Sequence, residues 1–236
     1  MIKEEIIYGL HAVEEFVSSY PEKVNKVLLS SPRPNLERLL RTLGVPFQKA
    51  PLSRIESLCP KVNHQGVIAL VSPLPYHDIE DISSEEKIIL ALDGIEDPQN
   101  VGAILRTAEA AGIKSVIIPS RRSAPITSTV IKASSGAAIR LKVIRTNSLP
   151  STLEKLKGKG FWIVGSEING ALRYDTVDYP FPSILVLGSE GKGIHRTIQK
   201  LCDLTVFIPI YGKVQSLNVS VAAGIILYEM LKKIKN

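Results

Sequence analysis

Apolar and polar positions in the first part of the chain follow two different periods. Apolar residues recur with helical spacing over residues 9–19 and 35–43, and they form short strand-like runs over residues 24–30 and 66–71. Alternation of helices and strands over so short a stretch predicts a small α/β domain, which we place at residues 1–72.

The periodicity is lost immediately after this domain. The stretch opens with Pro73-Leu74-Pro75 and continues with acidic and serine residues. Closely spaced prolines without apolar periodicity are typical of an extended connection. We therefore predict a linker at residues 73–86.

Strand-like apolar runs return from residue 87 onward. They read IILAL, SVIIP, LKVI, FWIV, ILVLG and VFIPI, and helical or loop segments separate them. This pattern predicts an α/β fold in which helices cover both faces of a mostly parallel sheet, at residues 87–236. Phe161 and Trp162 lie inside one of the runs and are expected in its core.

Composition narrows the possible functions. Lys and Arg total 29 against 23 Asp and Glu, a net charge of +6 that attracts a polyanion such as RNA but is shared by many unrelated proteins. The two cysteines and four histidines show no metal-ligand spacing, so no metal is expected. No apolar run has the length of a signal sequence or a membrane span, so we expect a cytoplasmic protein without a membrane segment.

The first segment that carries chemistry begins at Asp97-Pro98. Asp is a favoured N-cap and Pro is favoured at the first helical position, so a helix is predicted to begin there. The apolar residues that follow form one stripe, which places Arg106 on roughly the opposite side. Arg106 is therefore outside the core, and taken alone it is most simply an arginine on a solvated helix face.

Two further segments join a strand to a loop. Residues 187–193, LGSEGKG, follow an apolar strand, at the sheet edge where open α/β sheets bind ligands. They match neither GxxxxGK[ST] nor GxGxxG, which counts against a dinucleotide-dependent oxidoreductase, and an ordinary glycine-rich turn remains open. Residues 208–220, IPIYGKVQSLNVS, lead into an apolar helix that Ser216 or Asn218 can simply cap.

Taken together in this order, the three segments resemble the three motifs of the SpoU (TrmH-type) branch of the SPOUT methyltransferases. Residues 121–125 and 135–137 resemble stretches between its first two motifs, and residues 8–13 and 64–67 resemble its small substrate-binding domain. The closest likeness is to the guanosine 2′-O-methyltransferases of large-subunit ribosomal RNA. The resemblance implies methyl transfer from S-adenosylmethionine to a ribose 2′-hydroxyl, a deep trefoil knot and a homodimer.

The resemblance also implies site residues. The cofactor pocket is expected around Gly188, Ile208, Pro209, Ser216, Leu217 and Asn218. The catalytic set is expected to comprise Asn100, Arg106, Glu190, Ser216 and Asn218. Because a guanidinium stays protonated, Arg106 is expected to stabilise the developing alkoxide, and in a homodimer it can act across the interface.

Positive and aromatic-ring side chains supply candidate RNA contacts. They are His11, His64, Arg121, Arg122 and Lys132, with Arg140 and Arg145 as further phosphate contacts. Each of these taken singly is better explained as a solvated charge or a structural histidine.

Three alternatives to the ribosomal enzyme remain. They are a transfer-RNA 2′-O-methyltransferase, an antibiotic-resistance ribosomal-RNA methyltransferase and a non-catalytic RNA-binding assembly factor. The separate N-terminal domain favours the ribosomal enzyme, and the intact polar set counts against a protein freed from catalysis.

Overall fold

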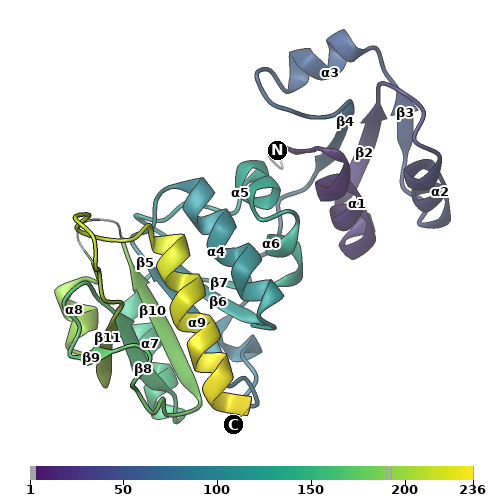
Figure 1. Cartoon of the computed structure of the whole chain (residues 1–236). Coiled ribbons are helices and arrows are strands. Elements are labelled where there is room, and N and C mark those ends of the chain that lie inside the picture. Colours follow the sequence, from purple (N-terminus) through teal and green to yellow (C-terminus); the bar gives the residue numbers. More distant parts are fainter. Residues whose placement is uncertain (1–3, 190, 192, 236) are drawn as a thin grey trace. The chain divides into compact units, whose positions relative to one another are not determined.

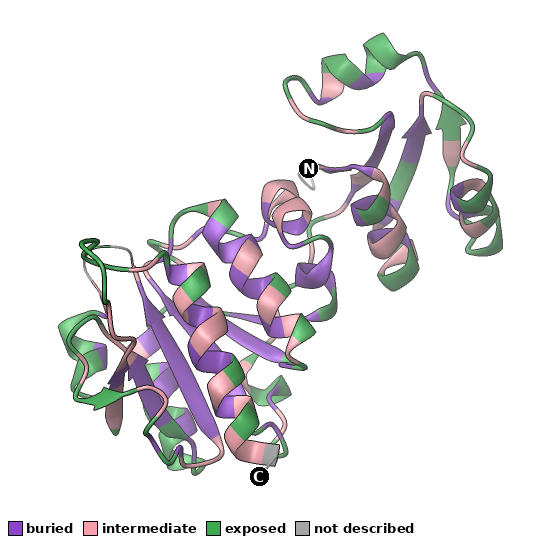
Figure 2. Cartoon of the chain, viewed as in Figure 1, coloured by how far each residue is buried: buried purple, intermediate pink, exposed green. Residues whose placement is uncertain are grey.

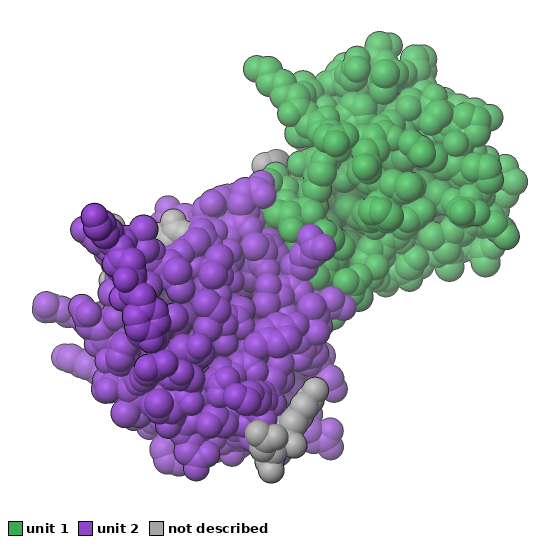
Figure 3. Space-filling view, in the orientation of Figure 1, with its two compact units in different colours: residues 1–75, 126–140 green, residues 76–125, 141–236 purple. Residues whose placement is uncertain are grey.

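The computed structural model describes residues 4–189, 191 and 193–235 (Figure 1). The chain divides into two compact units, which Figure 3 colours separately: residues 1–75 with 126–140, and residues 76–125 with 141–236. Residues 126–140, which the sequence pattern placed in the second domain, thus group with the first, and residues 76–86 of the expected linker group with the second.

The first unit is a small sheet with helices, as predicted. Its described strands have the order β1-β4-β2-β3; β4 is antiparallel to β1 and β2, and β3 is parallel to β2. The strands are β1 (Glu5–Tyr8), β2 (Val24–Leu29), β3 (Phe47–Lys49) and β4 (Val67–Val71). The helices are α1 (Leu10–Ser19), η1 (Pro21–Lys23), α2 (Pro34–Thr42), α3 (Leu52–Leu58), α5 (Ser128–Ala133) and α6 (Ala137–Arg140).

Packing explains why residues 126–140 belong to this unit. Helix α5 contacts β1, and α6 contacts α1. Val130 and Ile131 of α5 are buried, and the guanidinium of Arg140 lies 2.6 Å from the carboxylate of Glu15 on α1. These contacts join positions more than a hundred residues apart, which no local pattern reveals.

The second unit contains a seven-stranded sheet in the described part of the chain, with the order β7-β6-β5-β10-β8-β11-β9. Each of its strand pairs is parallel, so the predicted parallel sheet is confirmed. Its strands are β5 (Ile88–Asp93), β6 (Ser115–Pro119), β7 (Lys142–Thr146), β8 (Trp162–Ser166), β9 (Leu172–Arg173), β10 (Ser183–Gly188) and β11 (Leu204–Phe207). Its helices are η2 (Ile79–Asp81), α4 (Pro98–Ala110), α7 (Leu149–Gly158), α8 (Arg196–Gln199) and α9 (Val219–Lys235).

Helices cover both faces of this sheet. Helix α9 packs on α4 and β10, while α7 packs on β6 and β8; Figure 1 shows α9 in front of the sheet and α7 behind it. Strands β5 and β10 are buried throughout (Figure 2), as expected for central parallel strands covered on both sides. No helix among the described residues is long and apolar enough to cross a membrane.

One core prediction is wrong in part. Phe161 is buried, but Trp162 is 47% exposed. Successive side chains of a strand point to opposite faces, so two adjacent aromatic residues at the start of β8 do not share one environment. The trefoil knot stays a prediction.

Candidate cofactor site at the carboxyl ends of three strands

A cavity opens where β8, β10 and β11 end. It encloses about 640 Å³, part of it open to solvent. Its lining is supplied by the loops after these strands and by the first turn of α9: residues 166–168, then Gly188, Ser189, Gly191 and Gly193, then Ile208, Ile210 and residues 215–217, and finally Val219 and Ala222. The carboxyl edge of a parallel sheet is where such folds bind ligands.

Gly188 gives this cavity its floor. A Cβ atom at this position would lie 2.2 Å from the carbonyl carbon of Gly193, so no other residue fits unless the backbone moves. Ser189 and Gly193 exchange backbone hydrogen bonds of 3.1 and 3.0 Å and close a tight loop. Glu190, a predicted catalytic residue in this loop, lies outside the described residues.

A pair of amide side chains joins the first and third motifs. Asn218 donates from Nδ2 to Oδ1 of buried Asn100 at 2.9 Å, and its own Oδ1 accepts from the backbone nitrogen of Ser220 at 2.9 Å. The second bond caps α9, so Asn218 is both a helix cap and part of the predicted polar set. The predicted start of α4 is confirmed, because the Asp97 side chain accepts from the backbone nitrogen of Gln99 at 2.9 Å.

Glu167 is a residue of this site that the sequence analysis missed. Its Oε1 accepts hydrogen bonds from the Ile194 backbone nitrogen at 3.1 Å and from Gln199 Nε2 at 2.8 Å. Of the described residues that line the cavity, only Glu167 carries a charge. An acidic residue three positions after the predicted strand FWIV was the available signal.

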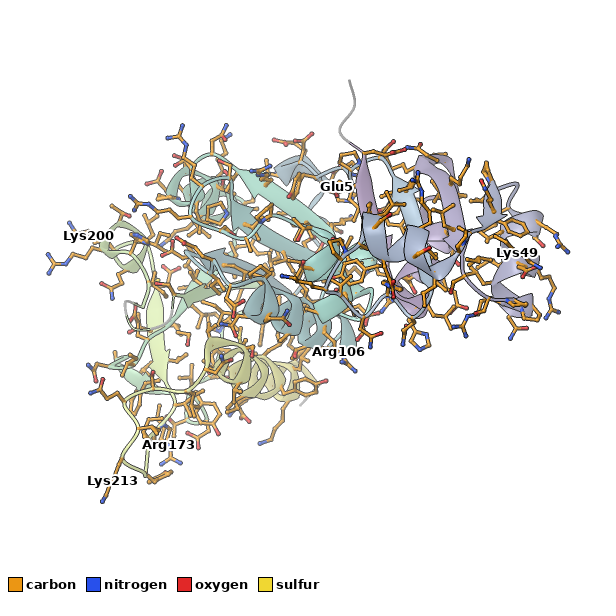
Figure 4. All side chains as sticks on the ribbon, turned by 90° about the horizontal axis from the view of Figure 1, so that it is seen from above. Glu5, Lys49, Arg106, Arg173, Lys200 and Lys213 are labelled. Atoms are coloured by element: carbon orange, nitrogen blue, oxygen red, sulfur yellow. The ribbon has the colours of Figure 1, made fainter. Side chains whose placement is uncertain are left out.

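The structure gathers some of the predicted residues and not others. Gly188, Ile208, Ser216 and Leu217 line the cavity, whereas Pro209 and Asn218 do not. Arg106 is also absent from the lining; it is exposed, as its helical position predicts, and Figure 4 shows it pointing outward from α4.

The candidate RNA contacts in the first unit have local partners. His64 accepts the Gly66 backbone N–H at Nδ1 at 3.0 Å. The ammonium of Lys132 lies 4.6 Å from the centre of the Tyr8 ring and donates to the backbone carbonyl of Asn63.

The remaining candidate side chains are open to solvent. The side chain of His11 is 85% exposed, 3.7 Å from the Glu14 carboxylate. Arg121 and Arg122 are exposed in the second unit, and Arg140 and Arg145 are exposed as well. Arg145 stacks over the Tyr76 ring at 5.0 Å. RNA contact at all these positions stays a prediction.

The parallel sheet and its edge cavity define an α/β protein with a cavity where such folds bind ligands. The family model of the SpoU rRNA Methylase family matches residues 87–228, and the model for RNA 2′-O ribose methyltransferase substrate binding matches residues 6–77. The chain belongs to the SpoU rRNA methylase family. This membership confirms the resemblance, the predicted RNA methyltransferase activity and S-adenosylmethionine as the methyl donor.

Individual relatives agree with this assignment. A Staphylococcus saprophyticus protein, whose name places it among TrmH family tRNA/rRNA methyltransferases, is 40% identical, with 98% of this chain and 97% of that protein covered. The SpoU methyltransferase AviRb from Streptomyces viridochromogenes is similar in structure, with a TM-score of 0.84, 26% identity and coverage of 98% and 90%. A TrmH/SpoU tRNA-modifying enzyme from A. aeolicus matches with a TM-score of 0.59, 30% identity and coverage of 64% and 77%.

Proposed function

We propose that this RNA methyltransferase modifies a ribose 2′-hydroxyl, that of a guanosine in large-subunit ribosomal RNA. The observation that carries the proposal is the match of residues 6–77 to a substrate-binding model for RNA 2′-O ribose methyltransferases, beside a catalytic match to the rRNA methylase family. We assign residues 1–72 to RNA binding, residues 73–86 to the connection and residues 87–236 to catalysis, with residues 126–140 packed on the first unit and added to RNA binding. Guanosine follows from the family resemblance alone.

The edge cavity suits S-adenosylmethionine. Ile208 and Leu217 can enclose an adenine ring while neighbouring backbone groups hydrogen-bond its edge. The carboxylate of Glu167 complements a cation, and the bound cofactor supplies an electrophilic methyl group on a positively charged sulfur. Ser216 lines the same cavity and offers a hydroxyl for orientation.

Arg106 serves the cavity of a second copy of the chain in this proposal. Its exposure, and its position outside the lining of its own cavity, support this role in a second molecule. Val221 and Tyr228, both on α9, are about half exposed and offer apolar surface for a homodimer. The guanidinium then stabilises the alkoxide that develops as the 2′-hydroxyl loses its proton to solvent or to a neighbouring phosphate.

The N-terminal domain holds the RNA in this proposal. His11 and His64 contact the substrate from the first unit, together with Lys132. Arg121 and Arg122 contact phosphates from the catalytic unit, where cationic side chains supply affinity without reading sequence.

The function is tested by transfer of a labelled methyl group from S-adenosylmethionine to RNA that lacks modifications. Ribosomal and transfer RNA are offered separately, because the name of the Staphylococcus relative includes both, and the labelled nucleotide is mapped. Label on a ribose of one large-subunit guanosine supports the proposal. Label only on transfer RNA, or on a base, contradicts it.

The shared site is tested by mixing two inactive variants. Arg106→Ala keeps an intact cavity, and Gly188→Ala keeps Arg106. If Arg106 acts in the neighbouring subunit, random mixing restores about a quarter of wild-type turnover, since half of the dimers contain one complete site. Sedimentation confirms that each variant still dimerises. No recovery in mixed dimers places Arg106 in its own subunit's site.

A further inference from the structure

A cavity with several charged and polar side chains in its lining lies at the carboxyl ends of β5, β6 and β7. It belongs to the second unit and encloses about 690 Å³, part of it open to solvent. Its polar lining includes Asp93, Arg121, Arg122, Asn147, Ser148 and His195. In the strand order it lies on the other side of β10 from the cofactor cavity, and the two cavities share none of their described lining residues.

A buried carboxylate orients a histidine in this cavity. Asp93 ends β5 with a side chain that is 7% exposed. Its carboxylate accepts from the His195 backbone nitrogen at 2.7 Å and lies 3.0 and 3.1 Å from the ring Nδ1. Because a carboxylate only accepts, Nδ1 carries the proton. The other ring nitrogen, Nε2, has no hydrogen-bond partner among the described residues, and in the neutral imidazole it is an acceptor.

Two guanidinium groups make the same cavity cationic. Arg121 and Arg122 are both exposed, while the charge of Asp93 is buried against His195. Arg122 has a φ of 56°, a left-handed conformation that is unfavourable for an arginine and persists only where the surroundings hold it. The N-terminus of α7, capped by Ser148, adds positive potential at the cavity wall.

We propose that this cavity binds the sugar-phosphate backbone of RNA. The guanidinium groups of Arg121 and Arg122 hold a phosphate, and Nε2 of His195 accepts a hydrogen bond from a ribose 2′-hydroxyl. The inference rests on the proposed function and deepens it, because it adds a ribose contact by His195 to the phosphate contacts of the two arginines and places them in one cavity. His195 contacts the RNA directly, and Asp93 is the residue that positions His195.

Binding of labelled oligonucleotides tests the inference without any methyl transfer. A mixed-sequence single-stranded RNA and its 2′-deoxy counterpart are titrated with the full-length protein and followed by fluorescence anisotropy at several salt concentrations. Arg122→Asn is a suitable variant because asparagine tolerates the left-handed backbone. It is expected to lower the affinity for both oligonucleotides about tenfold and to reduce the slope of log affinity against log salt by about 0.7. Guanine-free oligonucleotides are expected to lose the same affinity, because phosphate contacts carry no sequence information.

His195→Asn distinguishes the proposed RNA contact of His195 from its structural contact with Asp93. Asparagine keeps a side-chain N–H for Asp93 but lacks the Nε2 acceptor, so we expect the preference for RNA over DNA to fall about fivefold while S-adenosylmethionine affinity is unchanged. In the methyl-transfer assay the KM for RNA rises and kcat stays within twofold. Lys159→Ala, which removes an exposed charge at the opposite end of α7, is the matched control and leaves the RNA-over-DNA preference and the arginine-dependent salt slope unchanged.

The outcomes distinguish this inference from the proposed function. A wild-type protein that binds RNA through these residues but methylates none supports the inference and counts against the function. Three results overturn the inference: no oligonucleotide binding by the wild type, variants with unchanged salt slope and RNA preference, or a kcat collapse in His195→Asn with unchanged binding.

Discussion

The two cavities at the carboxyl edge of one sheet carry opposite electrostatic character. Over β8, β10 and β11, glycine backbone and apolar side chains surround one carboxylate, that of Glu167. Over β5, β6 and β7, two arginines and a histidine surround a carboxylate that is already satisfied. A cationic methyl donor and a polyanionic substrate therefore have separate places to bind, sorted by charge on either side of β10.

Gly188→Ala is expected to have the largest effect, because it should weaken cofactor binding in one cavity and leave RNA binding in the other unchanged. The new methyl group would lie 2.2 Å from the Gly193 carbonyl carbon, so the loop that forms the cavity floor must move. We expect affinity for S-adenosylmethionine, measured by calorimetry, to fall at least about a hundredfold, or about 3 kcal/mol, while oligonucleotide affinity stays within twofold. Gly158→Ala is the control, because nothing lies within 4 Å of its added Cβ. If Gly188→Ala keeps wild-type affinity for the cofactor, this cavity is not the cofactor site.

Glu167→Gln sharpens the electrostatic side of the comparison. Glutamine keeps an oxygen that accepts the Ile194 and Gln199 hydrogen bonds, but it removes the charge. Attraction between opposite charges several ångströms apart in a partly solvated site is of the order of 1 kcal/mol. We expect affinity for the sulfonium cofactor to fall about fivefold. Affinity for S-adenosylhomocysteine, whose sulfur is neutral, falls less. Equal losses for the two ligands mean that Glu167 acts through loop structure and not through charge.

A smaller effect is expected from changes to the Asn100–Asn218 pair. They should lower the free energy of unfolding and leave RNA binding unchanged. Asn218→Ala removes both the α9 cap and the bond to Asn100, whereas Asn218→Ser keeps a capping oxygen and loses the bond to Asn100. Urea unfolding should show losses of about 2 and about 1 kcal/mol, respectively. If serine costs as much as alanine, the link between the first and third motifs carries the stability and the cap does not. Oligonucleotide binding serves as the unaffected control.

The sequence pattern predicted those features of the second unit that depend on neighbouring residues. Central parallel strands are nearly continuous apolar runs, so β5 and β10 were visible as such. The resemblance to the family's motifs implied Gly188, Ile208 and Leu217, which line the cavity at the sheet edge. In the first unit, by contrast, strand β3 contains too few residues for a period to show in the sequence.

The missing features are those that join distant segments. The hydrogen bond between Asp93 and His195 spans 102 positions, and no pattern around either residue predicts the partner. Glu167 lines a cavity that the loops after three different strands form together, so its own segment does not indicate the cavity. For the same reason, the packing of residues 126–140 on the first unit required the structure.

The smallest effect near neutral pH is expected at Cys202, which contacts residues beside both cavities. The Cys202 thiol donates to the backbone carbonyl of Ile198, which lines the cationic cavity, at 3.4 Å, and it packs against Gly165, directly before the first lining residue of the cofactor cavity. Burial, above all other causes, raises the pKa of this thiol to about 12 from an ordinary value of 9.0.

The sign of the resulting pH dependence follows from proton binding. Below pH 9 the thiol is protonated in both the folded and the unfolded chain, so it contributes its full stabilisation. Between pH 9 and about 12 only the unfolded chain releases the proton, so stability falls as pH rises, by at most about 1.4 kcal/mol per pH unit and by less because the thiol is partly solvated. Cys202→Ser, similar in size and without this titration, should flatten the alkaline loss in urea unfolding curves. Parallel pH profiles for the two proteins contradict the assignment, and since other groups titrate equally in both, the difference between the curves belongs to Cys202.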